Sequence, residues 1–430
     1  MNIIFLIMVG IAFLAAAWRQ LMWLPVEGQS APMEALSAAI VQSAAGAVDL
    51  AIGLVGVMTL FLGLMKVAEA GGMLRIIARL IRPLMVRLFP DVPADHPAMG
   101  AMILNLSANA LGLGNAATPF GLRAMQALDT LNPRPGTATD AMALFLAINT
   151  SSVTLLPTGV IAARAAAGSL DPAGILPTTL IATIGSTTAA ILAAKFFRRR
   201  MAPVAAGAAP APPPAVTNDL DAATGDAPAQ GYPLWASLLA LAVLLGLVPL
   251  AVIYGKRISP WIIPLLMLFF LLFGLLRKVR VYEVLVEGGK EGFQMALRII
   301  PYLVAILVAV GMLQASGAMG ALVGWLGPYT TMVGLPAEAL PMALMRPLSG
   351  SGAYGIMLAI IKDPAIGPDS YIGYLVGTLQ GCSETTFYVL AVYFGAVQVR
   401  RIRHTLAAAL TADVVGVALA IITCRYILGN

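Results

Sequence analysis

The chain has 430 residues, of which 60% are hydrophobic and 11% are charged, with a formal net charge of +6. Ordinary soluble domains carry about 25% charged residues, so the composition excludes a soluble protein and indicates an integral membrane protein. In such a protein a small positive net charge is no sign of nucleic-acid binding. Two cysteines and two histidines are too few for a Cys/His metal cluster or catalytic pair, and we expect neither an enzyme nor a cofactor-binding protein.

Four apolar segments of the first half are long enough, or nearly so, to span a membrane, which takes about 20 residues. They fall at Ile3–Leu24, Leu50–Met65, Ala141–Ala163 and Ile175–Ala194. The first contains three consecutive alanines at 15–17 that resemble a signal-peptide cleavage site, but no Lys or Arg precedes them and the apolar run continues. We therefore interpret this segment as the first membrane helix.

A segment rich in Ala and Pro, about 201–231, separates the two halves, and its composition cannot bury enough apolar surface to fold. The second half then offers candidate spans at Ala236–Tyr254, Pro260–Leu276, Ile299–Leu313, Tyr371–Val399 and Leu406–Cys424. We divide the chain into a membrane half at 1–200, a cytoplasmic linker at 201–231 and a membrane half at 232–430, in which 236–254 is an extra helix.

Each half also contains an apolar stretch interrupted by small and polar residues, at about 98–125 and 336–361. A second polar group follows each stretch, in the spans that begin at 141 and 371. Polar side chains and Gly or Pro breaks at membrane depth occur where they face protein or a water-filled cavity. Because the pair of motifs occurs in both halves, it predicts a substrate site at the interface of two repeats, as in a transporter.

The candidate substrate-binding residues of the first half are amides and hydroxyls: Asn105, Ser107, Asn109, Asn115, Thr118, Asn149, Ser151, Ser152 and Thr154. Those of the second half are Arg346, Ser349, Ser351, Gln380, Ser383, Glu384, Thr385 and Thr386. Gly112 and Gly114 allow a sharp bend in the first stretch, and Pro157 favours local unwinding of the span at 141–163. Two alternatives stay open: the residues at 105–118 serve close helix packing alone, or the hydroxyls near 150 bond back to their own helix.

The basic residues predict the orientation, because Lys and Arg are enriched in cytoplasmic loops. Clusters at 195–200, 277–280 and 400–403 place these loops in the cytoplasm, and Lys256-Arg257, in a short outer turn, is the exception. All other assignments agree if the two interrupted stretches enter and leave the membrane on the same side. We therefore predict an all-α, polytopic inner-membrane protein of two inverted repeats with re-entrant helical hairpins; if the hairpins crossed, the repeats would be parallel.

Several motifs resemble known families. The run NLSANALGLGNAATPFGL, at 105–122, resembles spore maturation protein A. The runs RIIPYLVA, RPLSGSGA and GCSETTFY, which begin at 298, 346 and 381, resemble spore maturation protein B. The chain is therefore similar to a fusion of the two proteins, whose nucleoside-recognition or gate domain is shared with concentrative nucleoside transporters and the ferrous-iron permease. This resemblance implies inverted repeats with hairpins and is compatible with ion coupling, but it does not fix the substrate.

Glu384 is the most informative single residue. A carboxylate halfway along a membrane span must be protonated, paired or bound to a cation, so Glu384 would carry a coupling proton, ligate Na⁺ or hydrogen-bond the substrate. The alternative is a structural ion pair with Arg346, which could itself bind a substrate carboxylate. Asp413, in the last span, fits a proton path or a pairing within the bundle equally well. His404, near an expected helix start, is interpreted as a solvated surface residue.

The sequence favours a secondary transporter of a small polar solute, such as a nucleoside, an amino acid or a short peptide, that works by alternating access with Na⁺ or H⁺ as the driver. We expect a multi-pass protein of the bacterial inner membrane, in contact with the lipid bilayer and without a nucleic-acid partner, and a homo-oligomer stays open. The alternative is a non-transporting membrane scaffold that assists envelope or spore maturation.

Overall fold

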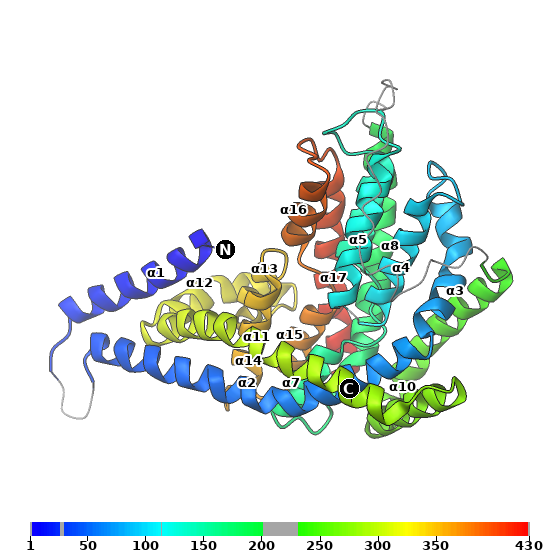
Figure 1. The fold of residues 1–430 in the computed structure, drawn as a ribbon. Helices are drawn as coiled ribbons and strands as arrows, with labels where there is room; N and C mark the ends of the chain where they lie inside the picture. The colour runs from blue at the N-terminus through cyan, green and yellow to red at the C-terminus, as the bar shows by residue number, and fades with distance from the viewer. Residues whose placement is uncertain (1, 26–29, 113, 201–230, 429–430) are drawn as a thin grey trace.

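The computed structural model describes residues 2–25, 30–112, 114–200 and 231–428 (Figure 1). Every regular element in these ranges is a helix, and no β-strand occurs there. The predicted all-α class is therefore confirmed. The linker expected at 201–231 lies, except for its last residue, outside the described residues.

The helices follow the same order in the two halves. Those before the linker are α1 (Asn2–Leu21), α2 (Pro32–Ala70), α3 (Met73–Leu88), α4 (Pro97–Ala110), α5 (Gly114–Asp129), α6 (Asp140–Thr150), α7 (Thr158–Ala166), η1 (Pro172–Ile175) and α8 (Leu176–Arg200). Those after it are α10 (Leu234–Leu276), α11 (Val281–Ala315), α12 (Ala318–Met332), η2 (Ala337–Ala339), α13 (Leu340–Met345), α14 (Gly350–Lys362), α15 (Tyr371–Gly381), α16 (Thr386–Ala396) and α17 (Thr405–Leu428).

Matching residues begin matching helices, which shows that the two halves are repeats. Gly72 precedes α3 with φ 82°, and Gly317 precedes α12 with φ 78°; glycine adopts this left-handed conformation without steric strain. Thr139 accepts a hydrogen bond from the Met142 amide at the start of α6, and Ser370 does the same for Gly373 at the start of α15. Hydroxyl side chains are preferred at such N-caps because they satisfy a free backbone N–H group.

Equivalent helices of the two repeats run antiparallel, so the repeats are inverted as predicted. Along α2 and α11, Gly311 lies against Ser43, Gly292 against Met58 and Gly288 against Leu62. Along α8 and α17, the Thr178 and Cys424 side chains both hydrogen-bond to the Thr378 hydroxyl, whereas Ser186, farther along α8, donates to the Ala412 carbonyl at 2.8 Å. Figure 1 shows α2 and α11 side by side across the lower part of the molecule, with α8 and α17 upright.

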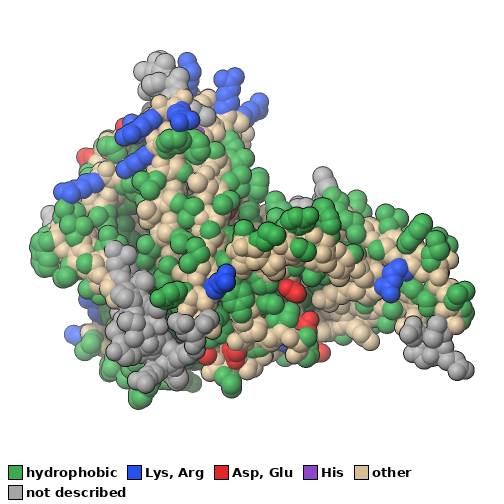
Figure 2. Space-filling view, turned by 180° about the vertical axis from the view of Figure 1, so that it is seen from behind, with side chains coloured by type: hydrophobic (Ala, Val, Ile, Leu, Met, Phe, Trp, Pro, Cys, Tyr) green, Lys and Arg blue, Asp and Glu red, His purple; other side chains and the backbone are tan. Residues whose placement is uncertain are grey.

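Four segments are long and apolar enough to cross a membrane: α2, Pro172–Arg200, α11 and α17. Figure 2 shows hydrophobic side chains over the flanks of the molecule, while Lys and Arg side chains cluster at the upper end of its upright part. This distribution is the one expected of helices whose middles face lipid and whose ends face water. The chain is thus a multi-pass membrane protein.

The two predicted hairpins are present but unequal. In the first, α4 packs against α5 and is followed by a turn at 111–112, where Gly112 has φ 76°. In the second, α13 has only six residues and leads through 346–349 into α14. Pro347 favours this early stop, because proline has no backbone N–H group to continue the helical hydrogen bonds.

Three expected boundaries are wrong. The expected turn at Lys256-Arg257 lies within α10, a single helix of 43 residues, because Lys and Arg are good helix formers that do not end a helix. The span expected at Leu50–Met65 is the later part of α2, which extends back through an alanine-rich segment to Pro32. The span expected at Ile299–Leu313 is likewise the later part of α11, whose preceding residues from Val281 include Glu, Lys and Arg, which are good helix formers, and no proline to end the helix.

The repeats are joined at both ends of α8 by arginine contacts that we term clamps. In the Arg164 clamp, Arg164 donates to the Pro368 carbonyl at 2.6 Å and pairs with Asp369 at 3.0 Å. In the Arg403 clamp, Arg403 donates to the Ala138 carbonyl at 3.2 Å and pairs with Asp140 at 2.7 Å.

The clamps lie at opposite ends of α8. Arg164 also contacts Asp171, just before η1 and α8, while Asp140 also pairs with Arg198 in the last turn of α8. In both clamps an arginine at the end of the second half of a broken helix, or just after it, holds the start of the broken helix of the other repeat. The inversion of the repeats therefore places one such contact near each end of the fold.

Candidate functional site

Two broken helices, one from each repeat, meet inside the fold. The first break, residues 151–157, separates α6 from α7, and the second, residues 382–385, separates α15 from α16. The unwinding predicted near Pro157 is therefore present. Broken helices leave backbone groups without helical partners, and one is used between the repeats, where the Glu384 amide donates to the Thr150 carbonyl at 2.7 Å.

Each break is also held by the hairpin of its own repeat. The Leu155 amide donates to the Ala110 carbonyl at 2.9 Å, and the Phe387 amide donates to the Pro347 carbonyl at 3.0 Å. The Leu156 carbonyl lies so close to Gly112 that a side chain at this position would collide with it. Hairpin tips and breaks from both repeats thus form one continuous polar centre.

Three of the predicted amides form a single buried network in the first repeat. Asn149 donates to the Asn105 side chain, Asn109 donates to Asn149 at 3.4 Å, and Asn105 donates to the Ala117 carbonyl at 2.7 Å. At most 8% of each residue is exposed. The network joins α4, α5 and α6, so these amides fix the hairpin against the first broken helix.

The hydroxyl groups of the first repeat mostly bond to nearby backbone. Ser107 donates to Ile103, Ser151 to Ala147 and Thr154 to Ser152, in each case to a carbonyl. The back-bonding alternative therefore describes these hydroxyls better than an arrangement in which they line a cavity. Thr187 of α8 donates to the Ser151 carbonyl, which satisfies one backbone group freed by the break.

Arg346 holds the second break. Its guanidinium donates to the Ser383 carbonyl and, at 3.3 Å, to the Thr385 hydroxyl, while its Nε–H group has no acceptor within the described structure. Only 7% of Arg346 is exposed. Among the described residues it forms no ion pair with Glu384, which is half-buried, so the alternative of a structural pair between these two residues is not realised.

The other predicted residues occupy different environments. Ser349 caps α14 by accepting from the Gly352 amide at 3.0 Å, whereas Ser351 is exposed. Gln380 is half-buried, with no hydrogen-bond partner at Oε1. Ser152 is buried and Thr118 half-buried. Asn115 lies in the first turn of α5, and its side chain falls outside the described structure.

Asp413 belongs to this centre, although it was not among the predicted site residues. Thr386 donates to its Oδ2 atom at 2.7 Å, while Oδ1 is buried without a partner. The Arg346 charge acts on this carboxylate, but the two groups do not come within ion-pair distance. A lone acid in the apolar run Leu406–Cys424 marks Asp413 as unusual, yet the sequence does not show that it faces the second break.

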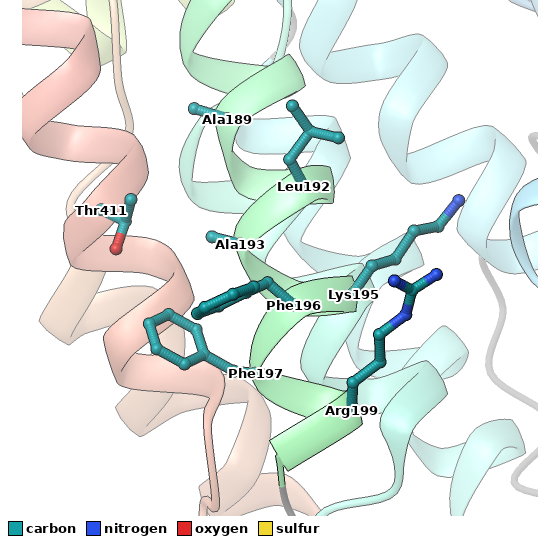
Figure 3. Close-up of a pocket in the computed structure, with 8 residues that line it drawn as sticks. All are labelled: Ala189, Leu192, Ala193, Lys195, Phe196, Phe197, Arg199 and Thr411. Carbon is teal, nitrogen blue, oxygen red and sulfur yellow. The ribbon is translucent and has the colours of Figure 1, made fainter.

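A surface groove of about 670 Å³ is separate from this centre. It is lined by apolar residues of α8, by Lys195 and Arg199, and by Thr411 of α17. Figure 3 shows Phe196 and Phe197 on the side of α17, while Lys195 and Arg199 point to the other side of α8. It contains no residue of either break, so we do not assign it to the candidate site.

The chemistry available at the centre is polar recognition. No group of three or more His, Cys, Asp or Glu residues that could hold a metal ion occurs in the part of the chain described here. The centre instead offers amides, hydroxyls, one guanidinium and two carboxylates, together with backbone groups at the helix ends, which suit anions at N-termini and cations at C-termini. Such a set can bind and orient a small polar molecule.

The family model Gate, described as "Nucleoside recognition", matches residues 51–167 and 296–400, more than half of the chain. These segments contain both hairpins and both breaks. The chain belongs to this family. In this Gate-family chain, the matched segments fall in the two repeats and include Arg346 and Glu384.

Two relatives from Bacillus subtilis (strain 168) each resemble part of this Gate-family chain. Spore maturation protein B is 44% identical over 168 residues, which is 39% of this chain and 93% of that protein. Spore maturation protein A is 45% identical over 152 residues, which is 35% of this chain and 78% of that protein. The predicted resemblance to both proteins is therefore confirmed.

Two solved structures align along nearly the whole chain, but weakly. CNTnw in an intermediate state aligns with a TM-score of 0.42 and 14% identity, covering 99% of this chain and 91% of that chain. The YdaH transporter of Alcanivorax borkumensis aligns with a TM-score of 0.39 and 16% identity, covering 99% and 98%. Likenesses of this size carry no conclusion about this protein.

Proposed function

We propose that this protein is a secondary transporter of the bacterial inner membrane that moves a small polar solute by alternating access, driven by a gradient of H⁺ or Na⁺. The observation that carries the proposal is the junction of the two breaks at the Glu384 amide and the Thr150 carbonyl. Binding sites of secondary transporters commonly lie where broken helices of inverted repeats meet.

The surroundings of the junction support a binding role. Arg346 and Asp413 are more than nine-tenths buried, and each has a polar atom without a partner in the described structure. Buried polar atoms are normally satisfied by protein or ordered water. A solute with complementary polar groups would satisfy them, whereas a purely structural centre has no need to leave them free.

The test is thermal unfolding of the purified protein with nucleosides, amino acids and dipeptides, with and without Na⁺ and across pH. A solute that binds only the folded state raises the melting temperature by mass action, by an amount that corresponds to about 2.7 kcal/mol at 100 times its Kd. We expect Glu384→Gln to abolish the shift, and the matched variant Glu338→Gln, at an exposed glutamate of η2, to retain it.

A solute identified in this way should then be accumulated by liposomes that contain the protein. The second candidate function, a membrane scaffold, is favoured by the names of the two relatives, which concern spore maturation. Stabilisation by no solute and no ion would contradict the transport proposal and support the scaffold.

A further inference from the structure

A buried acid and a buried base face the second break without forming an ion pair. Asp413 lies in the middle of α17, and Arg346 lies between α13 and α14; each is 7% exposed. Both charged side chains are thus withdrawn from water, and neither is fully satisfied by its neighbours. This arrangement differs from that of the clamps, in which every arginine contacts a carboxylate directly.

The free atoms of the pair are complementary. The two Nη groups of Arg346 donate to the Ser383 carbonyl and the Thr385 hydroxyl, and its Nε–H edge has no acceptor in the described structure. Asp413 accepts from Thr386 at Oδ2, which leaves Oδ1 without a donor. The site therefore has one donor edge that fits an anion and one carboxylate oxygen that can take a proton.

Arg346 and Asp413 are connected through adjacent residues of the second break, since Arg346 donates to the Thr385 hydroxyl and Thr386 donates to Asp413. Two of the helices packed against α17 contribute polar groups near Asp413. Cys382, at the end of α15, contributes its thiol, and Thr386, at the start of α16, donates to Asp413. Near Asp413, α8 supplies Ser186. The single ionisable residue of α6, Asp140, lies at its far start and pairs with Arg403.

We infer, on the basis of the proposed transport function, that Arg346 receives a carboxylate group of the solute and that Asp413 carries the proton that travels with it. The solute carboxylate binds the free Nε–H edge, where guanidinium geometry suits it. It thereby offsets the positive charge that favours the ionised form of Asp413, and Oδ1 takes up one proton from water. One proton and one carboxylate enter together, and the charge of the site is unchanged.

A proton fits this site better than Na⁺. A sodium ion needs several oxygen ligands, whereas Asp413 offers a single free oxygen beside a fixed positive charge that would repel a second cation. A proton needs only that one oxygen. The coupling is reciprocal: if protonation strengthens carboxylate binding, carboxylate binding must strengthen protonation by the same factor.

The second break lies near the surface of the fold. Ser351, Phe387 and Tyr388 beside it are exposed, and Glu384 is half-buried. A solute bound at Arg346 would therefore extend past residues of the break that the sequence already singled out. The chemical class predicted for the solute is a small molecule with a free carboxylate, such as an amino acid or a short peptide.

The experiment is proton uptake by the purified full-length protein in weakly buffered solution, followed with a pH-indicator dye. The probes are acetate, alanine and alanylalanine, each compared with its carboxamide. We expect the wild-type protein to bind at least one acid but not the matching amide, to take up about one proton per carboxylate bound, and to bind more tightly as pH falls. Arg346→Gln should abolish the preference for acids.

Asp413→Asn imitates the protonated acid, so it should bind the same probe without proton uptake and with an affinity that no longer depends on pH. Asp49→Asn, at an exposed carboxylate of α2, is the matched control and should behave as the wild type. Should Asp413→Asn fail to fold, the wild-type protein alone still decides: carboxylate binding without proton uptake overturns the inference.

Three further results would overturn it: equal binding of acids and amides, proton uptake that persists in a folded Asp413→Asn protein, or binding of neutral solutes such as nucleosides in place of any acid. The last result would leave the proposed transporter intact. Failure of every solute to bind would instead contradict the proposed function itself.

Discussion

Asn149 stands at the centre of a hydrogen-bond network in which each amide depends on the next. It donates to Asn105 and accepts from Asn109, and all three residues are buried. Removal of one partner leaves the other amides buried without a hydrogen-bond partner. Each such unpaired buried group lowers the free energy of unfolding by about 1–3 kcal/mol. The stability of the first hairpin should therefore be sensitive to a single amide.

We expect Asn149→Leu to lower the free energy of unfolding by about 2–5 kcal/mol, because it leaves Asn105 and Asn109 with unpaired groups. Denaturant unfolding of the purified protein measures this change. Thr411→Ala, at an exposed hydroxyl that bonds to its own helix, should change the free energy by less than about 0.5 kcal/mol. Equal stability of Asn149→Leu and Thr411→Ala would show that the network is not needed.

His404 is the residue for which the surface interpretation is wrong. It lines a small pocket with Arg87, Lys195 and Arg198, yet only 2% of it is exposed, and its Nδ1 atom has no partner in the described structure. It lies just before the membrane-spanning helix α17. Burial lowers the pKa of its imidazole, and the neighbouring Arg403 lowers this pKa further.

Because the pKa of His404 is lower in the folded state than its unfolded value of about 6.5, the unfolded state binds more protons as the pH falls through that value. The contribution of His404 is therefore fully present above about pH 6.5 and is lost as the pH falls toward the folded-state pKa. We expect the melting temperature of the wild-type protein to fall more steeply below this pH than that of His404→Gln. His96→Gln is the control, and parallel curves for wild type and His404→Gln would contradict the prediction.

At the scale of elements, the two arginine clamps act between the same parts of opposite repeats. Asp369 is 34% exposed in the Arg164 clamp, and Asp140 is 23% exposed in the Arg403 clamp. Each clamp holds the start of the broken helix of one repeat against the end of the broken helix of the other repeat. Loss of either clamp should favour separation of the repeats at that end alone.

We expect Asp369→Asn and Asp140→Asn to have opposite effects on the accessibility of the centre from the two sides of the membrane. Charge-assisted hydrogen bonds contribute about 1.5–3 kcal/mol each, enough to shift a two-state population by a factor of roughly 10–150. Labelling of the native Cys382, which is buried at the second break, measures the accessibility in oriented vesicles with a membrane-impermeant thiol reagent; Cys424, also buried, is replaced by Ala. Increased labelling from the same side in both variants would disprove the assignment.

The first helix break could be predicted from the sequence, because Pro157 and the hydroxyls before it disfavour continuous helix. The second break could not: the sequence predicts one continuous span at Tyr371–Val399, and this segment divides into α15 and α16. Glu384 stands out in the sequence as a carboxylate in an apolar span, but it does not show that the helix ends there.

The partners of both breaks were not predictable either. The contact between the Glu384 amide and the Thr150 carbonyl depends instead on how the two repeats pack. For the same reason the sequence could not decide between Glu384 and Asp413 as the acid near Arg346.

At the scale of the whole molecule, the long helices α2 and α11 hold the repeats together through glycines. A Cβ atom at Gly292 would lie 2.7 Å from the Met58 carbonyl oxygen and 2.7 Å from the Thr59 Cα. At Gly53 and Gly56, on the same pair of helices, a Cβ atom would meet nothing within 4 Å. Small residues allow such close approach of membrane helices.

We expect Gly292→Ala to lower the free energy of unfolding by about 1–3 kcal/mol, because backbone atoms of α2 must move away. Gly56→Ala should be neutral or slightly stabilising, since alanine favours helix over glycine by about 0.5–1 kcal/mol. Thermal and denaturant unfolding of the two variants provides the comparison. A stable Gly292→Ala protein would mean that the repeats tolerate a wider separation here.

The placement of one clamp at each end of α8 affects how often ions can leak through the protein across the membrane. An open path for ions would require both clamps to be released at once, so its probability is the product of two small numbers. If each release costs about 2 kcal/mol, each is present about one time in 30 and both together about one time in 1,000. Two modest contacts in series would thus protect an ion gradient as well as a single contact of about 4 kcal/mol, while each end can open in turn at about half that cost.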